Sequence, residues 1–138
     1  MSTLQPHIET FKRGGTTWGR LLEDFTYKTP ITGYDKEIKL RNFHCKLTKD
    51  GTLKVFCLSE WDFGSFAIDT PAMVYASLAH DAFCHMTNWL LLPWEVRFQA
   101  DKYFWQCLTE AGATTSRWWR VPGVMLYSQF VARWKDRK

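Results

Sequence analysis

FHCKLTKDGTLKVFCL, residues 43–58, sets the topology of the first half of the chain. On both sides of Asp50-Gly51, apolar residues alternate with polar ones, which is the period of a strand with one buried face. An Asp-Gly pair between two such runs is a strong signal for a two-residue hairpin turn, because both central positions of that turn take a positive φ. The sequence therefore predicts an antiparallel hairpin in which Lys49 faces Thr52.

Further strand patterns precede this hairpin. Residues 22–28 alternate in character, residues 29–35 form a turn cluster, and apolar positions from Ile38 to Leu47 indicate one strand with a bulge near Asn42. Residues 1–16 are interpreted as a flexible polar leader that ends in a Gly-Gly pair.

The period changes to that of a helix after Pro71, a residue that suits the first turn of a helix. Helices are predicted over residues 72–86 and 94–111, and a third is predicted to start at Pro122. The expected fold is α+β: a small antiparallel sheet from the N-terminal half, packed against about three helices from the C-terminal half. Residues 17–135 form this single domain, and residues 136–138 are a basic tail.

The composition excludes several classes of protein. Of the 138 residues, 46% are hydrophobic and 17% are aromatic, which argues against intrinsic disorder. No apolar run reaches the roughly 20 residues of a membrane helix. The net charge of +4 is spread along the chain, so nucleic-acid binding through the Arg117–Arg120 stretch (RWWR) is not the favoured interpretation. A cytoplasmic location is expected, since the first residues lack the pattern of a secretory signal.

The four cysteines show no C-x-x-C pair, which disfavours a structural zinc site. In the predicted register Cys45 faces Phe56 and Cys57 lies on the opposite face, so no disulfide is expected. Cys84 lies four residues after His80 and shares its helix face, but nucleophilic cysteines usually sit at turns or helix N-termini. A Cys-His nucleophile pair is therefore disfavoured.

Polar residues interrupt the apolar helical pattern at His80-Asp81, and Arg97 and Asp101 share a face of the next helix. One interpretation is a buried hydrogen-bonded network. The other is a metal or acid–base site, in which His80, Asp81 and Asp101 hold a divalent ion that activates water. Otherwise no cofactor is expected. A turn with Asp62 and Ser65 precedes the first helix and could converge on the pair.

These residues also carry a resemblance. The D-x-x-S turn (residues 62–65), A-x-x-x-H-D-A-F (residues 76–83) and R-x-x-A-D-x-x-F (residues 97–104) together resemble an uncharacterised protein family of bacteriophages and prophages. The early L-L-E-D-F-x-Y stretch and the late V-x-x-Y-x-x-x-V stretch also fit. The resemblance implies a phage setting and no established reaction. The special positions that it implies are Asp62, Ser65, His80, Asp81, Arg97 and Asp101.

Two functions follow as hypotheses. The first is a small phage-encoded accessory protein in the cytoplasm of an infected bacterium, which binds a host or phage protein as an inhibitor or in virion assembly. Interface hot spots are rich in Trp, Tyr and Arg, and the candidates here are Trp89, Trp94, Trp118, Trp119 and Arg120. The alternative is a metal-dependent hydrolase of phosphoester or peptide bonds that uses the Asp/His-Asp/Asp constellation.

Overall fold

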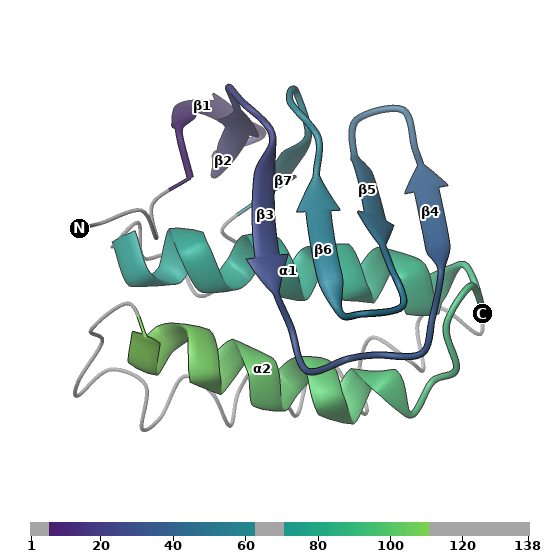
Figure 1. The fold of residues 1–138 in the computed structure, drawn as a ribbon. Coiled ribbons are helices and arrows are strands. Elements are labelled where there is room, and N and C mark those ends of the chain that lie inside the picture. Colours follow the sequence, from purple (N-terminus) through teal and green to yellow (C-terminus); the bar gives the residue numbers. More distant parts are fainter. Residues whose placement is uncertain (1–5, 63–70, 111–138) are drawn as a thin grey trace.

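The computed structural model describes residues 6–62 and 71–110, and its strands form two antiparallel sheets (Figure 1). The first sheet has the order β1-β2-β7, with bounds Ile8–Arg13, Thr16–Leu21 and Glu60–Asp62. The second has the order β3-β6-β5-β4, with bounds Phe25–Lys28, Thr52–Val55, His44–Leu47 and Lys36–Lys39. The predicted α+β class is confirmed, with two sheets where the sequence indicated one.

Strand β1 occupies part of the stretch that the sequence analysis assigned to a flexible leader. It pairs with β2 along its whole length, from Ile8 opposite Leu21 to Arg13 opposite Thr16. Gly14 and Gly15 form the connection with φ values of 60° and 82°, as a two-residue hairpin turn requires. Most of β1 is exposed, so the strand lacks the apolar alternation that reveals a half-buried strand in a sequence.

The hairpin of β5 and β6 is confirmed, but its register differs by one residue from the predicted one. Leu47 pairs with Leu53 and Cys45 with Val55. The turn has three residues, because Gly51 N–H donates to Thr48 O at 3.0 Å and Thr48 N–H donates to Thr52 O at 2.9 Å. This is a turn closed by a left-handed glycine, with Gly51 at a φ of 90°. The observed register places all four apolar partners on the buried face.

The stretch predicted as one bulged strand is a second hairpin. Strands β4 and β5 are antiparallel partners, and Leu40 N–H donates to Phe43 O at 2.7 Å across a turn made by Arg41 and Asn42. Two exposed polar residues in sequence reverse the chain here instead of adding a bulge.

The cysteines are all free thiols, as expected. The predicted reason was wrong, because it relied on the shifted register. Cys45 is buried in β5, whereas Cys57 follows the end of β6 and is exposed.

Both predicted helices are confirmed: α1 spans Pro71–Asn88 and α2 spans Val96–Glu110. Figure 1 shows α1 crossing behind the four-stranded sheet and α2 running alongside α1. The third predicted helix, from Pro122, lies outside the described residues. In the described part of the chain, neither helix is long and apolar enough to cross a membrane.

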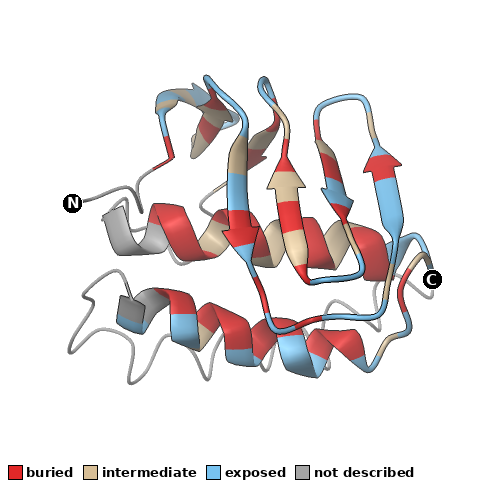
Figure 2. Cartoon of the chain, in the orientation of Figure 1, coloured by how far each residue is buried: buried red, intermediate tan, exposed pale blue. Residues whose placement is uncertain are grey.

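The core lies between the four-stranded sheet and the helix pair, where the buried residues gather (Figure 2). Tyr27 on β3 joins the layers, because its ring packs against Tyr75 of α1 and Tyr103 of α2 at centroid distances of 5.1 and 6.4 Å. Its hydroxyl donates to the carbonyl oxygen of Tyr75 at 2.6 Å. This contact holds α1 at a defined distance from the sheet.

Candidate functional site

Two pairs of polar residues lie on different faces of α1. His80 shares a face with Cys84, and Asp81 shares a face with His85, because residues four apart on a helix are neighbours. The first pair meets α2, whereas the second lines a pocket beside the sheets. The predicted set of Asp62, His80, Asp81 and Asp101 is thus divided between two places. In the part of the chain that the structure describes, no three His, Cys, Asp or Glu side chains are grouped closely enough to hold a metal ion.

On the α2 side, His80 stands between a carboxylate and a thiol. Its Nε2 lies 2.6 Å from Oδ1 of Asp101, which is fully buried, and its Nδ1 lies 3.6 Å from Sγ of Cys84. Burial by itself lowers the pKa of His80, while the charge of a Cys84 thiolate and the hydrogen bond to Asp101 raise it. The net result is a pKa of about 10, so the imidazole is protonated at neutral pH.

Arg97 of α2 is buried against the end of α1. Its Nε donates to Thr87 Oγ1 at 2.6 Å, and its Nη2 donates to Cys84 O at 3.5 Å and to Asn88 Oδ1. Its guanidinium also lies over the ring of Trp94, 4.4 Å from the centroid. A cation at this place is favourable, because the last carbonyl groups of a helix carry partial negative charge. These contacts give Arg97 a structural role in joining the two helices.

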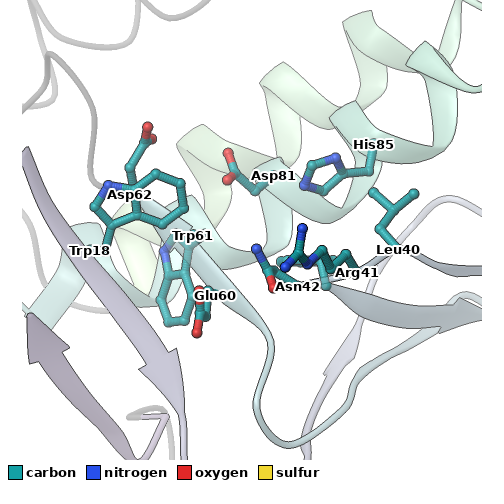
Figure 3. Close-up of a pocket in the computed structure, with 10 residues that line it drawn as sticks. Trp18, Leu40, Arg41, Asn42, Glu60, Trp61, Asp62, Asp81 and His85 are labelled. Atoms are coloured by element: carbon teal, nitrogen blue, oxygen red, sulfur yellow. The ribbon is translucent and has the colours of Figure 1, made fainter. Parts of the chain in front are cut away.

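A pocket of about 380 Å³ opens where the two sheets approach α1 (Figure 3). Its volume falls within the range of small-ligand sites, about 300–1,000 Å³. Polar and aromatic side chains reach it from four elements: Trp18 from β2, Asp62 from β7, Arg41 and Asn42 from the β4–β5 turn, and Asp81 and His85 from α1. Figure 3 shows the Asp81 carboxyl group on the same side of the pocket as Asp62.

Three titratable groups that line this pocket have shifted pKa values. Burial raises the pKa of Asp81 to about 7, and the nearby carboxylate of Asp62 adds to the rise, while His80 and Arg97 oppose it. Burial also raises the pKa of Asp62. Burial and the charge of Arg97 lower the pKa of His85, whose ring packs on Phe43. Near neutral pH, a carboxyl that exchanges readily between its protonated and ionised forms therefore faces the same pocket as a neutral imidazole, which suits proton transfer.

The residues predicted to bind a partner fall into three groups. Trp89 is 63% exposed at the start of the α1–α2 connection. Trp94 is partly buried and covers Arg97. Trp118, Trp119 and Arg120 lie outside the described residues, as does Ser65 of the candidate turn.

Two exposed apolar side chains were missed by the sequence analysis: Leu90, which follows Trp89 and is 83% exposed, and Phe98 of α2, which is 52% exposed. We call the adjacent residues Trp89 and Leu90 together the apolar loop surface. Phe98 falls within the apolar pattern of α2, so the sequence suggested burial. For Leu90, the sequence offered one signal: no glycine follows the end of α1, so another residue has to take the left-handed conformation there.

The chain was compared with protein-family models, with curated proteins and with solved structures, and none of the three comparisons found a match.

Proposed function

We propose that this protein acts by binding another protein, and that the apolar loop surface is the centre of the contact. The setting suggested by the sequence motifs is a phage-infected bacterium, in which the partner is a host or phage protein. The observation that carries the proposal is the conformation of Leu90, which combines the largest exposure among the exposed large apolar residues described with a left-handed backbone at a φ of 61°.

Leu90 occupies the position after a helix where glycine is the usual residue. Leu90 N–H donates to Thr87 O at 3.0 Å, and Leu91 N–H donates to Met86 O at 2.9 Å. This pair of bonds is the Schellman pattern, in which the first residue after the helix cap takes the left-handed conformation. A side chain there costs about 1–2 kcal/mol. Leucine therefore pays a conformational cost that glycine would avoid.

Exposure of one apolar residue is common on protein surfaces and decides nothing by itself. Here, however, the exposed side chain also strains the backbone, whereas glycine would make the same cap of α1 without that strain. Strain of this kind persists at binding and switch positions, where function compensates for it. Trp89, the preceding residue, is 63% exposed and enlarges the apolar area at the same connection. Such a projecting aliphatic side chain beside an exposed tryptophan fits an apolar pocket on a partner protein.

The test is Leu90→Gly, with Leu58→Gly as the matched control. Leu58 is also exposed, at 64%, and also left-handed, at a φ of 76°, but it lies in the β6–β7 connection. Relief of about 1–2 kcal/mol of strain is offset by about 0.5–1 kcal/mol of extra chain entropy in glycine. Both variants should therefore melt within a few degrees of the wild type.

Tagged wild type and both variants are purified from phage-infected cells, and co-purifying proteins are quantified by mass spectrometry. We expect one partner to be retained by Leu58→Gly and to fall at least tenfold with Leu90→Gly. The same partner is then purified and its affinity for the three proteins is measured directly. An affinity unchanged by Leu90→Gly would refute the proposal.

A second candidate function is hydrolysis in the pocket, with Asp81 as the acid and His85 as the base. The observation that favours it is the convergence of Asp62, Asp81 and His85 on one pocket with displaced pKa values. Turnover of nitrophenyl esters and phosphoesters should be lost in Asp81→Asn and kept in Asp35→Asn, which alters an exposed carboxylate elsewhere. Equal turnover by the two variants would remove this candidate.

A further inference from the structure

A thiol, an imidazole and a carboxylate lie in line between the two helices. Sγ of Cys84 is 3.6 Å from Nδ1 of His80, and Nε2 of the same ring is 2.6 Å from Oδ1 of Asp101. Helix α1 supplies the first two at a spacing of four residues, and α2 supplies the third. This is the order of groups that activates cysteine nucleophiles: the carboxylate orients the imidazole, and the imidazole faces the sulfur.

The surroundings hold this arrangement in place. Asp101 is fully buried, and the side chain of His80 is 10% exposed. The ring of Phe104 packs against His80 at a centroid distance of 5.3 Å. Cys84 is partly buried, unlike Cys45 and Cys107, which are fully enclosed. Its sulfur is thus oriented by a partner in a residue that is not fully enclosed.

The position of Cys84 inside α1 favours thiol–disulfide exchange over acyl transfer. Acyl transfer needs N–H groups that stabilise an oxyanion. In the interior of α1 the backbone N–H groups are already used in helical hydrogen bonds. Thiol–disulfide exchange has no such need, since the charge passes from one sulfur to another. A small disulfide is therefore the class of reactant that fits.

We propose that Cys84, oriented by His80 and Asp101, is a nucleophilic site that undergoes thiol–disulfide exchange with low-molecular-weight disulfides. The Cys84 thiolate attacks one sulfur of the disulfide and forms a new S–S bond, while the original S–S bond breaks. The leaving thiolate takes the proton that His80 carries on Nδ1. One disulfide and one thiol are consumed, and one mixed disulfide and one thiol are produced.

The chain contains its own reference thiols. Cys57 is exposed, and its Sγ donates to the backbone oxygen of Leu22 at 3.3 Å, whereas the Sγ of Cys84 faces an imidazole. Burial raises the pKa of the Cys45 thiol, so that residue serves as an unreactive reference. No Lys or Arg lies between residues 55 and 96, so Cys57 and Cys84 share one tryptic peptide. Chymotrypsin, which cleaves after aromatic residues, separates the two.

The experiment exposes the folded protein to oxidised glutathione at pH 7 without oxygen and follows glutathionylation of each cysteine by mass spectrometry. We expect Cys84 to react at least tenfold faster than Cys57, and Cys45 to stay unmodified. His80→Gln should reduce the rate at Cys84 at least tenfold without changing the rate at Cys57. Asp101→Asn should give an intermediate rate at Cys84. Reaction of Cys84 no faster than Cys57 in the wild type would overturn the proposal, as would an unchanged rate in His80→Gln.

The pH profile of the wild type provides a test that needs no variant to fold. Because His80 faces the sulfur of Cys84, the rate at Cys84 should depend less steeply on pH between pH 6 and pH 8 than the rate at Cys57. Parallel profiles for the two residues would show that the His80 contact is structural only, and would also overturn the proposal.

Discussion

Replacement of Gly51 by alanine should destabilise the protein far more than the same change at another left-handed glycine. Gly51 closes the β5–β6 turn at a φ of 90°, and a Cβ placed there would lie 2.2 Å from the carbonyl oxygen of Thr29. Gly33 has a similar φ of 92°, and nothing lies within 4 Å of its Cβ position. The pair of variants therefore separates backbone strain from the close approach of the β3–β4 connection to the hairpin tip.

The expected size follows from three contributions. The left-handed conformation costs an alanine about 1–2 kcal/mol at either position. At Gly51 the crowded Cβ adds about 1–3 kcal/mol, because Thr29 has to move. That movement weakens the two hydrogen bonds that Gly51 O accepts from Thr29, from N–H at 2.8 Å and from Oγ1 at 2.9 Å. Each is worth about 0.5–1.5 kcal/mol. If both bonds are lost, Gly51→Ala should thus cost about 3–8 kcal/mol, whereas Gly33→Ala should cost about 1–2 kcal/mol.

Equilibrium unfolding in urea measures both values, and an unchanged slope against urea shows that the two variants unfold as the wild type does. The reduced entropy of the unfolded alanine chain affects both variants equally, so it cancels in the comparison. Equal losses in Gly51→Ala and Gly33→Ala would refute the reasoning, because they would mean that Thr29 yields to the Cβ at no cost.

Two further substitutions test the core and the pocket. Tyr27→Phe removes the hydroxyl that donates to the carbonyl oxygen of Tyr75 at 2.6 Å. It should lower the free energy of unfolding in urea by about 0.5–1.5 kcal/mol, because that carbonyl keeps its helical hydrogen bond within α1. The pKa of Asp81 is about 7 in the folded protein, against an ordinary value of 3.8. Between these two pH values the folded state keeps a proton that the unfolded state loses. The free energy of unfolding therefore falls as pH rises from about 4 to about 7. Asp81→Asn should therefore melt at a higher temperature than the wild type at pH 7.5 and at the same temperature at pH 4, whereas a constant difference would contradict the pKa.

The sequence predicted a helix or strand correctly where both its hydrophobic period and its boundary residues were present. The apolar period after Pro71 and the helical pattern from Trp94 predicted two helices, the second of which begins at Val96 in the structure. The Asp50-Gly51 pair located the β5–β6 hairpin. Strand β1 was not predicted, because most of its residues are exposed and its sequence therefore shows little apolar alternation.

The hairpin register was available in the sequence but was assigned from the wrong signal. Pairing Leu47 with Leu53 matches apolar residues across the strands and leaves Lys46 opposite Lys54 on the other face. A two-residue turn would have placed Leu47 opposite Lys54. The burial of matched pairs outweighs the preference of Asp-Gly for a two-residue turn, because a shift of one residue turns every side chain to the other face.

Helical spacing alone determined that His80 and Cys84 share one face of α1, and that Asp81 and His85 share another. Only the tertiary structure decided that the first face meets Asp101, while the second opens on the pocket beside Asp62. The spacing of residues within a helix follows from the geometry of its own backbone hydrogen bonds. The neighbour that each face meets depends on how the helix pair and the sheets pack to bury apolar side chains from the whole chain, and no local pattern encodes that choice.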